Sequence, residues 1–186
     1  MYASGSASGN TITGNNRDGF WMADWESGGM KGTASSATVS GNVVRGNYGV
    51  GLWFDVDSKT VTIDGNTVSG NIADGIRVEI SYNVIVRNNV VTGNGNSFGS
   101  IRGGGTSLFA CAGITVNTVS GIQIYGNTVS GNINGIGLQK RDRGSGIHGL
   151  RDLVNAVVHD NNVTMTSGSA VGQGTSGLVV LGTDTS

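Results

Sequence analysis

A six-residue phrase that begins and ends with asparagine recurs along this chain and constrains its fold more than any other feature. The phrase reads Asn-x-Val/Ile-x-Gly-Asn, and it starts at Asn10, Asn42, Asn66, Asn89 and Asn127, with a degraded copy at Asn161. The two cleanest intervals, Asn42 to Asn66 and Asn66 to Asn89, are 24 and 23 residues long. Short β-branched runs separated by Gly and Asn at such a period predict a stacked solenoid.

Residues 60–83 represent one rung of this solenoid. Alternation of apolar and polar residues predicts three short strands, broken near Asp64-Gly65 and again between Gly70 and Gly75. The apolar positions of all rungs are expected to face one common core, which each rung can bury only between neighbours. These positions are Val39, Val44, Leu52, Phe54, Val56, Val61, Ile63, Val68, Ile76, Val78, Ile80, Val84, Val86, Val91, Ile114, Val116, Ile122, Ile124, Val129, Ile136 and Leu138.

The recurrent asparagines are interpreted as corner residues, not as catalysts. Asparagine tolerates the left-handed backbone of a tight corner. When rungs stack at about 4.8 Å, each side-chain amide can also bond the equivalent amide in the next rung.

Composition excludes several functions. The net charge of −1 and the lack of a basic stripe argue against a nucleic-acid partner. No apolar run approaches the roughly 18 residues of a membrane span, and the N-terminus does not resemble a secretory signal. Cys111 is the only cysteine, so no intrachain disulfide can form. One continuous domain is expected over residues 1–186, as part of a longer protein.

The repeat Asn-x-Val-x-x-Asn followed by Gly-Ile-x-Val resembles the right-handed parallel β-helix superfamily of pectate-lyase-like proteins, over residues 5–165. The resemblance implies an all-β, single-stranded parallel β-helix of about six to seven rungs, with roughly 24 residues per rung plus loop insertions. It also implies a bacterial protein that acts outside the cell or at its surface. Members of the superfamily include polysaccharide lyases, glycoside hydrolases, uronate epimerases, phage tailspikes and non-catalytic carbohydrate-binding modules.

Strands that follow Gly-rich corners can be aligned, and their outward positions form two columns. The first strand is expected at residues 19–24. One column then reads Trp21, Trp53, Arg77, Thr115 and Gly137, and the next reads Asp24, Asp55, Glu79, Asn117 and Gln139. Exposed aromatic rings beside carboxylates and amides are what a sugar-binding groove needs. Loop insertions at 26–35, 95–112 and 141–152 flank this strand, and the substrate-binding set also includes Lys140 and Arg141.

The two acids in the second column suggest catalysis. Asp55 and Glu79 are expected about 5 Å apart. Two negative charges at that distance repel each other, so the pair must bind a cation, share a proton or form an ion pair with Arg77. A bound Ca²⁺ would suit a uronate lyase, whereas a proton-sharing pair matches a retaining glycosidase. The wider pair of Asp57 and Glu79 would suit inversion. The sequence establishes no cofactor, and Ca²⁺ at Asp55 and Glu79 stays an open alternative.

Polysaccharide is therefore the expected partner, and three functions stay open. The first is a lyase or hydrolase, and the second is a carbohydrate-binding module, which the short stack and the lack of a capping helix favour. The third is an adhesive or ice-binding surface on Thr/Ser columns such as Thr11, Thr67 and Thr128. The open ends of the stack expose strand edges, so an adjoining domain or self-association is expected to cover them.

Overall fold

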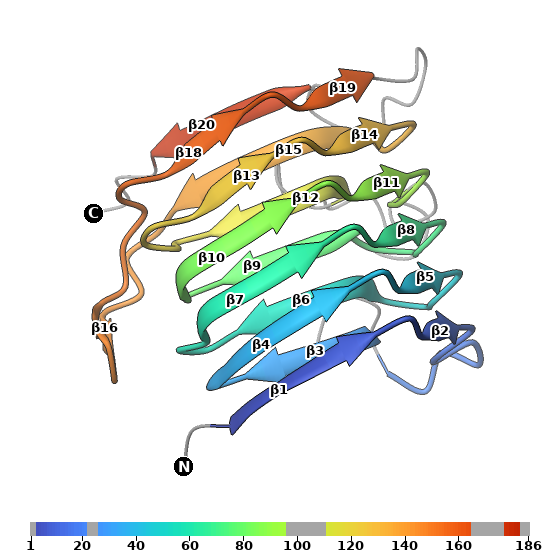
Figure 1. Ribbon diagram of the computed structural model, residues 1–186, viewed down its shortest axis with the longest axis horizontal. Coiled ribbons are helices and arrows are strands. Elements are labelled where there is room, and N and C mark those ends of the chain that lie inside the picture. The colour runs from blue at the N-terminus through green and yellow to red at the C-terminus, as the bar shows by residue number, and fades with distance from the viewer. Residues whose placement is uncertain (1–2, 22–25, 96–110, 165–176, 183–186) are drawn as a thin grey trace.

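The computed structural model describes residues 3–21, 26–95, 111–164 and 177–182, which form a parallel β-helix. Figure 1 shows the coils stacked along one axis, with three sheets running the length of the stack. The described residues contain strands and no helix, so they contain none that could cross a membrane. Each sheet has six strands, while the total number of rungs in the chain stays a prediction.

The three sheets are named A, B and C in the order in which the chain visits them, and all of their strands pair in parallel. Sheet A consists of β1 (Ala3–Ser8), β4 (Ser35–Ser40), β7 (Lys59–Asp64), β10 (Tyr82–Arg87), β13 (Gln123–Tyr125) and β18 (Val157–His159). Sheet B consists of β2 (Thr11–Thr13), β5 (Val43–Arg45), β8 (Thr67–Ser69), β11 (Val90–Thr92), β14 (Thr128–Ser130) and β19 (Asn162–Thr164). Sheet C consists of β3 (Gly28–Thr33), β6 (Val50–Asp55), β9 (Ile76–Glu79), β12 (Ala112–Asn117), β15 (Asn134–Lys140) and β20 (Leu178–Gly182).

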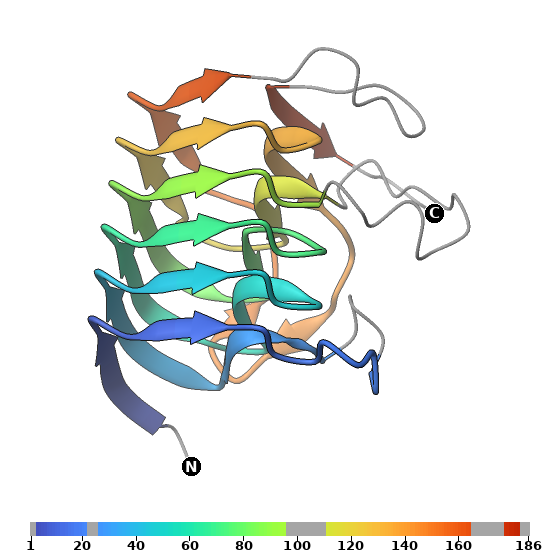
Figure 2. The ribbon, with the colours of Figure 1, turned by 90° about the vertical axis from the view of Figure 1, so that its right-hand side faces the viewer.

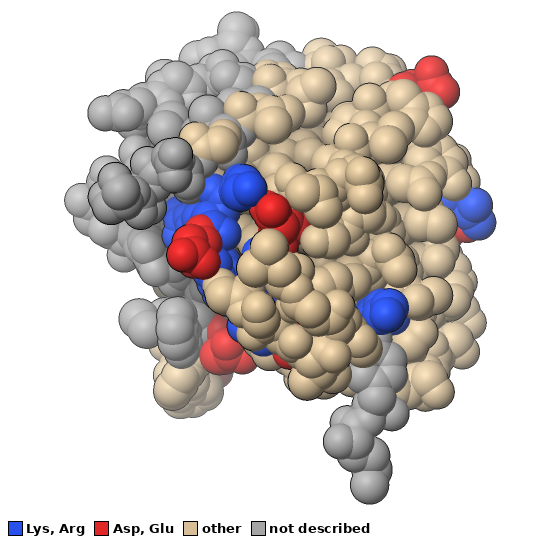
Figure 3. All heavy atoms as spheres, turned by 90° about the vertical axis from the view of Figure 1, so that its left-hand side faces the viewer, with Lys and Arg blue, Asp and Glu red and all other residues tan. Residues whose placement is uncertain are grey.

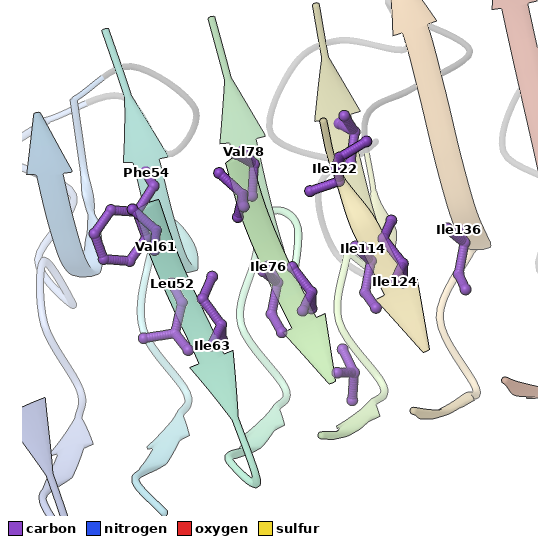
Figure 4. Close-up of a cluster of buried hydrophobic side chains, with 14 of the residues drawn as sticks. Leu52, Phe54, Val61, Ile63, Ile76, Val78, Ile114, Ile122, Ile124 and Ile136 are labelled. Atoms are coloured by element: carbon purple, nitrogen blue, oxygen red, sulfur yellow. The ribbon is translucent and has the colours of Figure 1, made fainter. Parts of the chain in front are cut away.

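The core lies inside the coil, where equivalent apolar residues of successive rungs stack in register. In sheet C, Leu52 pairs with Ile76, and Ile76 pairs with Ile114. These side chains and their counterparts from sheets A and B meet in the interior (Figure 4). Nearly all the predicted core positions are buried. Val56 is the exception, with 40% of its surface exposed, because β6 ends at Asp55 and Val56 lies in the left-handed turn that follows.

Two asparagine ladders run along the flanks of sheet B, as predicted. The Nδ2 of Asn66 donates to the Oδ1 of Asn89 at 2.9 Å, and its own Oδ1 accepts from the Nδ2 of Asn42 at 2.9 Å. The ladder asparagines do not themselves adopt the left-handed conformation that the sequence analysis expected. The residue before each of them does, for example Gly65 (φ 63°) and Asn88 (φ 55°). Two adjacent residues therefore form each corner: the first adopts the left-handed turn, and the asparagine that follows forms the ladder hydrogen bonds.

The glycine that opens a sheet C strand is required by close packing at the corner with sheet B. A Cβ added to Gly51 would lie 2.5 Å from the carbonyl oxygen of Gly75, 2.6 Å from a methyl group of Val68 and 2.8 Å from the Nδ2 of Asn71. Contacts this short are not tolerated by real side chains. The absence of a side chain at Gly51, the second residue of β6, therefore lets the β-branched core and the asparagine ladder approach the sheet C backbone.

Two of the predicted insertions can be judged. Residues 141–152 leave sheet C after β15, as predicted, and contain an antiparallel hairpin of β16 (Ser145–Gly146) and β17 (Gly149–Leu150). Residues 26–35 are not an insertion, because they contain β3 itself. Most of the third insertion, 95–112, lies outside the described residues.

The outward side of sheet B is regular and nearly free of charge. Figure 2 shows its short strands one above another. Thr67 pairs with Val43 on one side and with Val90 on the other, and all three side chains are exposed. The Thr/Ser columns therefore exist, and the exposed Arg45 interrupts one of them.

Candidate functional site

The outward face of sheet C carries most of the residues that the sequence singled out. Trp53 pairs in register with Arg77, and Arg77 pairs with Thr115, as predicted. The residue that pairs with Trp53 in the first rung is Lys31 of β3, so the prediction that Trp21 heads this column is wrong. Trp21 lies in the segment before β3 and is exposed, and Asp24 lies outside the described residues.

Trp53 faces outward from the coil, yet its side chain is not exposed as predicted. Only 4% of its surface is accessible, and it packs in a second apolar cluster outside the coil. That cluster contains Val50, Trp53, Ala73, Cys111 and Ile133. The indole N–H is buried and has no hydrogen-bond partner in the described part of the structure. Trp53 is thus a covered packing residue that stabilises the base of the site.

Two cations flank the Trp53 ring. The Nζ of Lys31 lies 3.6 Å from the ring centroid, and the guanidinium carbon of Arg77 lies 4.9 Å from it. Both distances are within the range of cation–π attraction, which is strongest where water is excluded. The ring therefore helps to hold two positive charges on a face that also contains buried carboxylates.

Asp55 is largely buried and ionically paired. Its Oδ2 lies 3.1 Å from the Nζ of Lys31, which also contacts the exposed Glu26 at 2.6 Å. Its Oδ1 accepts a hydrogen bond of 2.8 Å from the backbone N–H of Val56. The two interactions fix both carboxyl oxygens of Asp55 in place.

Arg77 is held by an acid that the sequence analysis did not assign to the site. Asp74 is fully buried in the turn before β9, and its Oδ2 accepts a 2.7 Å hydrogen bond from the Nε of Arg77. Its Oδ1 accepts from the backbone N–H of Ala112 at 2.9 Å. Burial alone would lower the pKa of Arg77, but the charges of Asp74, Glu79 and Asp55 outweigh it and raise that pKa.

Glu79 differs from Asp55 in its surroundings. Burial raises the pKa of its carboxyl group, and the neighbouring charges of Asp55 and Asp74 add to this, while Arg77 and Arg143 act in the opposite direction. Its Oε1 accepts a hydrogen bond of 3.1 Å from the Nδ2 of Asn117, the next residue of the same column. The two acids on adjacent strands therefore differ in their contacts: Asp55 is bound by Lys31, whereas burial raises the pKa of Glu79 above its usual value.

Asp57, the acid expected to form a wider pair with Glu79, is bound by a different residue. Asp57 lies in the left-handed turn beyond β6 (φ 59°), where the strand alternation no longer applies. Its carboxylate binds Arg151 of the 141–152 insertion. The hydrogen bonds from Arg151 lower the pKa of Asp57, and burial opposes that effect only in part.

The remaining predicted residues divide into two groups. Asn117 and Gln139 lie in one column with Glu79, as predicted, and both are buried. Lys140 and Arg141 are exposed at the end of β15, where Lys140 pairs with Asp152 at 2.8 Å. They lie beyond the column of acids, at the point where the insertion begins.

The charges on this face largely neutralise one another. Lys31 is shared by Asp55 and Glu26, and Arg77 is bound by Asp74. Figure 3 looks at the side of the stack on which β16 lies, and there Lys/Arg and Asp/Glu atoms lie close together near one edge of the view. Among the described residues, no group of three or more His, Cys, Asp or Glu side chains is arranged to hold a metal ion. Asp55 forms an ion pair with Lys31, a partner that the sequence had not suggested for it.

Sequence reasoning missed Lys31 and Asp74, although both leave a signal. Gly29-Met-Lys-Gly-Thr33 matches Gly51-Leu-Trp-Phe-Asp55 in its opening glycine and in the apolar residue that follows. Asp74 precedes Arg77 by three residues, a spacing that brings the two side chains together here. The first signal was outweighed by the aromatic residues at 20–21, which were aligned in the place of Lys31.

The geometry can be compared with known proteins. No curated protein and no solved structure gives a significant match to the chain. The family described as the right-handed β-helix region matches residues 1–112. Since this match covers more than half of the 186 residues and the sheets have the expected parallel architecture, the chain belongs to the right-handed β-helix family.

Proposed function

We propose that the outward face of sheet C binds a polysaccharide and cleaves its glycosidic bonds by hydrolysis. The observation that carries the proposal is the pair of Asp55 and Glu79 on adjacent strands in different electrostatic surroundings. Glycosidases need one carboxylic acid and one carboxylate on either side of the scissile bond. Burial raises the pKa of Glu79, which suits the acid, and the contact with Lys31 fixes Asp55 in position for the second role.

Glu79 is the proposed general acid. Its raised pKa keeps the proton available for the leaving oxygen, and Asn117 orients the carboxyl group. Asp55, anchored by Lys31 and by the Val56 amide, is the proposed nucleophile. Parallel strands lie about 4.8 Å apart, which is close to the carboxyl separation of about 5–5.5 Å found in retaining enzymes. The proposed reaction therefore retains the configuration at the anomeric carbon.

The polymer is proposed to lie along the stack axis. Asn117 and Gln139 extend the column beyond the acids, and Thr115 adds a hydroxyl group in the adjacent column. Amides and hydroxyls at a regular spacing suit the hydroxyl groups of successive sugars. Since such polymers are met mainly outside cells, the proposal includes an extracellular or cell-surface location.

Binding without turnover is the second candidate. It is favoured by the mutual neutralisation of charge on this face, because Lys31 is shared by Asp55 and Glu26, and Arg77 is bound by Asp74. In that case Asp55 and Glu79 accept hydrogen bonds from sugar hydroxyls and transfer no proton.

One panel experiment separates these readings. The protein is incubated with neutral and uronic-acid polysaccharides, with and without Ca²⁺, and both binding and released sugars are followed. We expect new reducing ends without an unsaturated product, and we expect Glu79→Gln to lower the rate by about 10²–10⁴ while binding is retained. Asp64→Asn, an ion-paired acid on sheet A, is the matched control and should be fully active. Unsaturated product would identify a lyase, and binding without product would establish the second candidate.

A further inference from the structure

The insertion between sheets C and A is much longer than the corner requires. The equivalent corner after β6 uses only residues 56–58, and the corner after β9 uses only residues 80–81. After β15 the chain takes residues 141–156 to reach β18. Figure 1 shows this segment descending along the side of the stack, past several rungs, before it returns. Two or three residues are enough to connect sheet C to sheet A, so the connection alone does not explain the length of residues 141–156.

The far end of the insertion is tied to an earlier rung by an ion pair. The Nη2 of Arg151 lies 2.9 Å from the Oδ2 of Asp57, and its Nε lies 3.1 Å from the Oδ1, so that two parallel hydrogen bonds form. Both side chains are largely buried, and 94 residues separate them in the sequence. Paired geometry of this kind is the strong form of a charge-assisted contact.

Further contacts fix the hairpin against the stack. The hydroxyl group of Tyr82 donates to the carbonyl oxygen of Gly149 at 2.9 Å, and the Tyr82 ring meets His148 edge-on at 5.4 Å between centroids. Gly146 packs directly on the Asp57 carboxylate and leaves no room for a Cβ there. Two features therefore hold the hairpin against Asp57. The side chain of Arg151, directly after β17, binds the carboxylate, and Gly146 of β16 has no side chain that would keep the hairpin away from it.

The near end of the insertion carries Arg143. Its carbonyl oxygen accepts from the Nη1 of Arg151 at 3.4 Å, and the next residue, Gly144, accepts from the backbone N–H of Arg151 at 3.0 Å. Arg143 is also close enough to Glu79 for its charge to act on that carboxyl group. The same arginine that binds Asp57 thus braces the segment from which Arg143 approaches Glu79.

We propose that Asp57 is a positioning residue, whose ion pair with Arg151 fixes the 141–152 insertion as an end wall of the sheet C site and holds Arg143 beside Glu79. This inference rests on the proposed function, because only that proposal makes the sheet C face a binding site. The ion pair and the hairpin contacts themselves do not depend on any substrate. The charged groups that face Glu79 are then Arg77, Asp55, Asp74 and, from the insertion, Arg143.

The test uses substrate-free protein. Asp57→Asn is the first variant, because asparagine tolerates the left-handed turn at this position while it lacks the charge that binds Arg151. Arg151→Met removes the ion pair from the other side, and Arg143→Gln removes only the charge near Glu79. Asp64→Asn is the matched control. Asp64 likewise forms an ion pair with an arginine, Arg87 of the next rung, but this pair lies on sheet A.

Two readouts are measured, namely amide exchange of residues 145–151 and the pKa of Glu79 by NMR titration. In both latch variants we expect exchange to accelerate about 10- to 100-fold, as the loss of a charged hydrogen bond implies. We also expect the pKa of Glu79 to rise in both latch variants, because Arg143 moves away from Glu79. The pKa should rise likewise in Arg143→Gln, because the positive charge itself is removed. The control should change neither. A purely structural latch would accelerate exchange and leave the pKa of Glu79 unchanged.

The outcomes separate this inference from the proposed function. If Arg143→Gln raises the pKa of Glu79 and Asp57→Asn does not, or if exchange in the hairpin is unchanged, the positioning role of Asp57 is overturned. If both readouts respond as expected and no polysaccharide is bound or cleaved by the wild-type protein, the positioning role stands and the proposed function fails.

Discussion

Replacement of Asn66 by alanine tests whether the asparagine ladder holds the rungs together. Asn66 is buried at the centre of the ladder. Its Oδ1 accepts from both the backbone N–H and the Nδ2 of Asn42, at 3.0 and 2.9 Å. Its Nδ2 donates to the carbonyl oxygen of Val39 and to the Oδ1 of Asn89, each at 2.9 Å. The side chain therefore connects three successive rungs.

The magnitude follows from the groups that alanine leaves behind. The backbone N–H of Asn42 would be buried without an acceptor, which costs about 1–3 kcal/mol. The Nδ2 of Asn42 still reaches the carbonyl oxygen of Ala7, and the Oδ1 of Asn89 still accepts from the backbone of residue 66. Each remaining lost bond contributes about 1 kcal/mol. Three such bonds are lost, namely those from the Nδ2 of Asn42 and from the Nδ2 of Asn66 to Val39 and to Asn89. We expect a total loss of about 4–6 kcal/mol, a large part of the 5–15 kcal/mol that stabilises a typical domain.

Asn10→Ala is the matched control, and equilibrium denaturation in urea is the assay. Asn10 belongs to the same ladder but is exposed in the first rung, where water can replace the lost partners. We expect this variant to lose less than about 1 kcal/mol. If the two substitutions destabilise the protein equally, the ladder does not contribute through buried hydrogen bonds, and the reasoning is refuted.

Other substitutions and pH changes test the site and the core. Trp53→Ala should lose about 3–5 kcal/mol of unfolding free energy, since the ring is buried in its own cluster, and a loss below about 1 kcal/mol would contradict that burial. Val78→Asp places an unpaired charge in the core, and circular dichroism should show an unfolded chain at 25 °C. Because Arg151 lowers the pKa of Asp57, this ion pair stabilises the fold above the unfolded pKa of about 3.9 and is lost as pH falls through the lower folded value. Hydrogen exchange of the hairpin should therefore stay slow at pH 5 and accelerate only under more acid conditions. Glu79 has the opposite sign: its raised pKa stabilises the fold most below about pH 4.3, and stability declines as pH rises through the folded value. A urea titration of Glu79→Gln against pH should lack that decline.

Much of the architecture could be predicted because the signals are local and repeated. A period near 24 residues, together with alternating apolar positions, determines which side chains face inward, and the same rule applies in every rung. Leu52, Ile76 and Ile114 stack in register as the alternation predicts. The alternation fails where the backbone leaves the extended region. Val56 and Asp57 follow β6 in left-handed turns, and the expected burial of Val56 does not hold.

The site was harder to predict, because it depends on contacts between distant segments. The outward position of Trp53 follows from alternation, whereas its burial follows from the apolar cluster that includes Ala73 and Ile133. Likewise, no local pattern reveals that Asp57 binds an arginine 94 residues away. Periodicity determines the direction in which a side chain leaves the coil, but not what covers it afterwards.

Sheets B and C differ in a way that bears on function. A solenoid needs only its inward faces for stability, so its outward faces are free to remain solvated. Sheet B follows this rule, and even its outward Val43 and Val90 are exposed. Sheet C instead buries outward polar groups such as Asp55, Asn117 and Gln139.

Burying a charge is unfavourable unless partners compensate it, and here the compensation requires Lys31 for Asp55 and Arg77 for Asp74. The fold gains no coil contacts from this arrangement, because the same register forms in sheet B without it. The coil does not need these buried charged groups, and their burial is energetically unfavourable. A functional role is therefore the simplest explanation for their presence. For this reason the sheet C face, and not the more regular sheet B face, is where we expect substitutions to abolish binding while the stack remains folded.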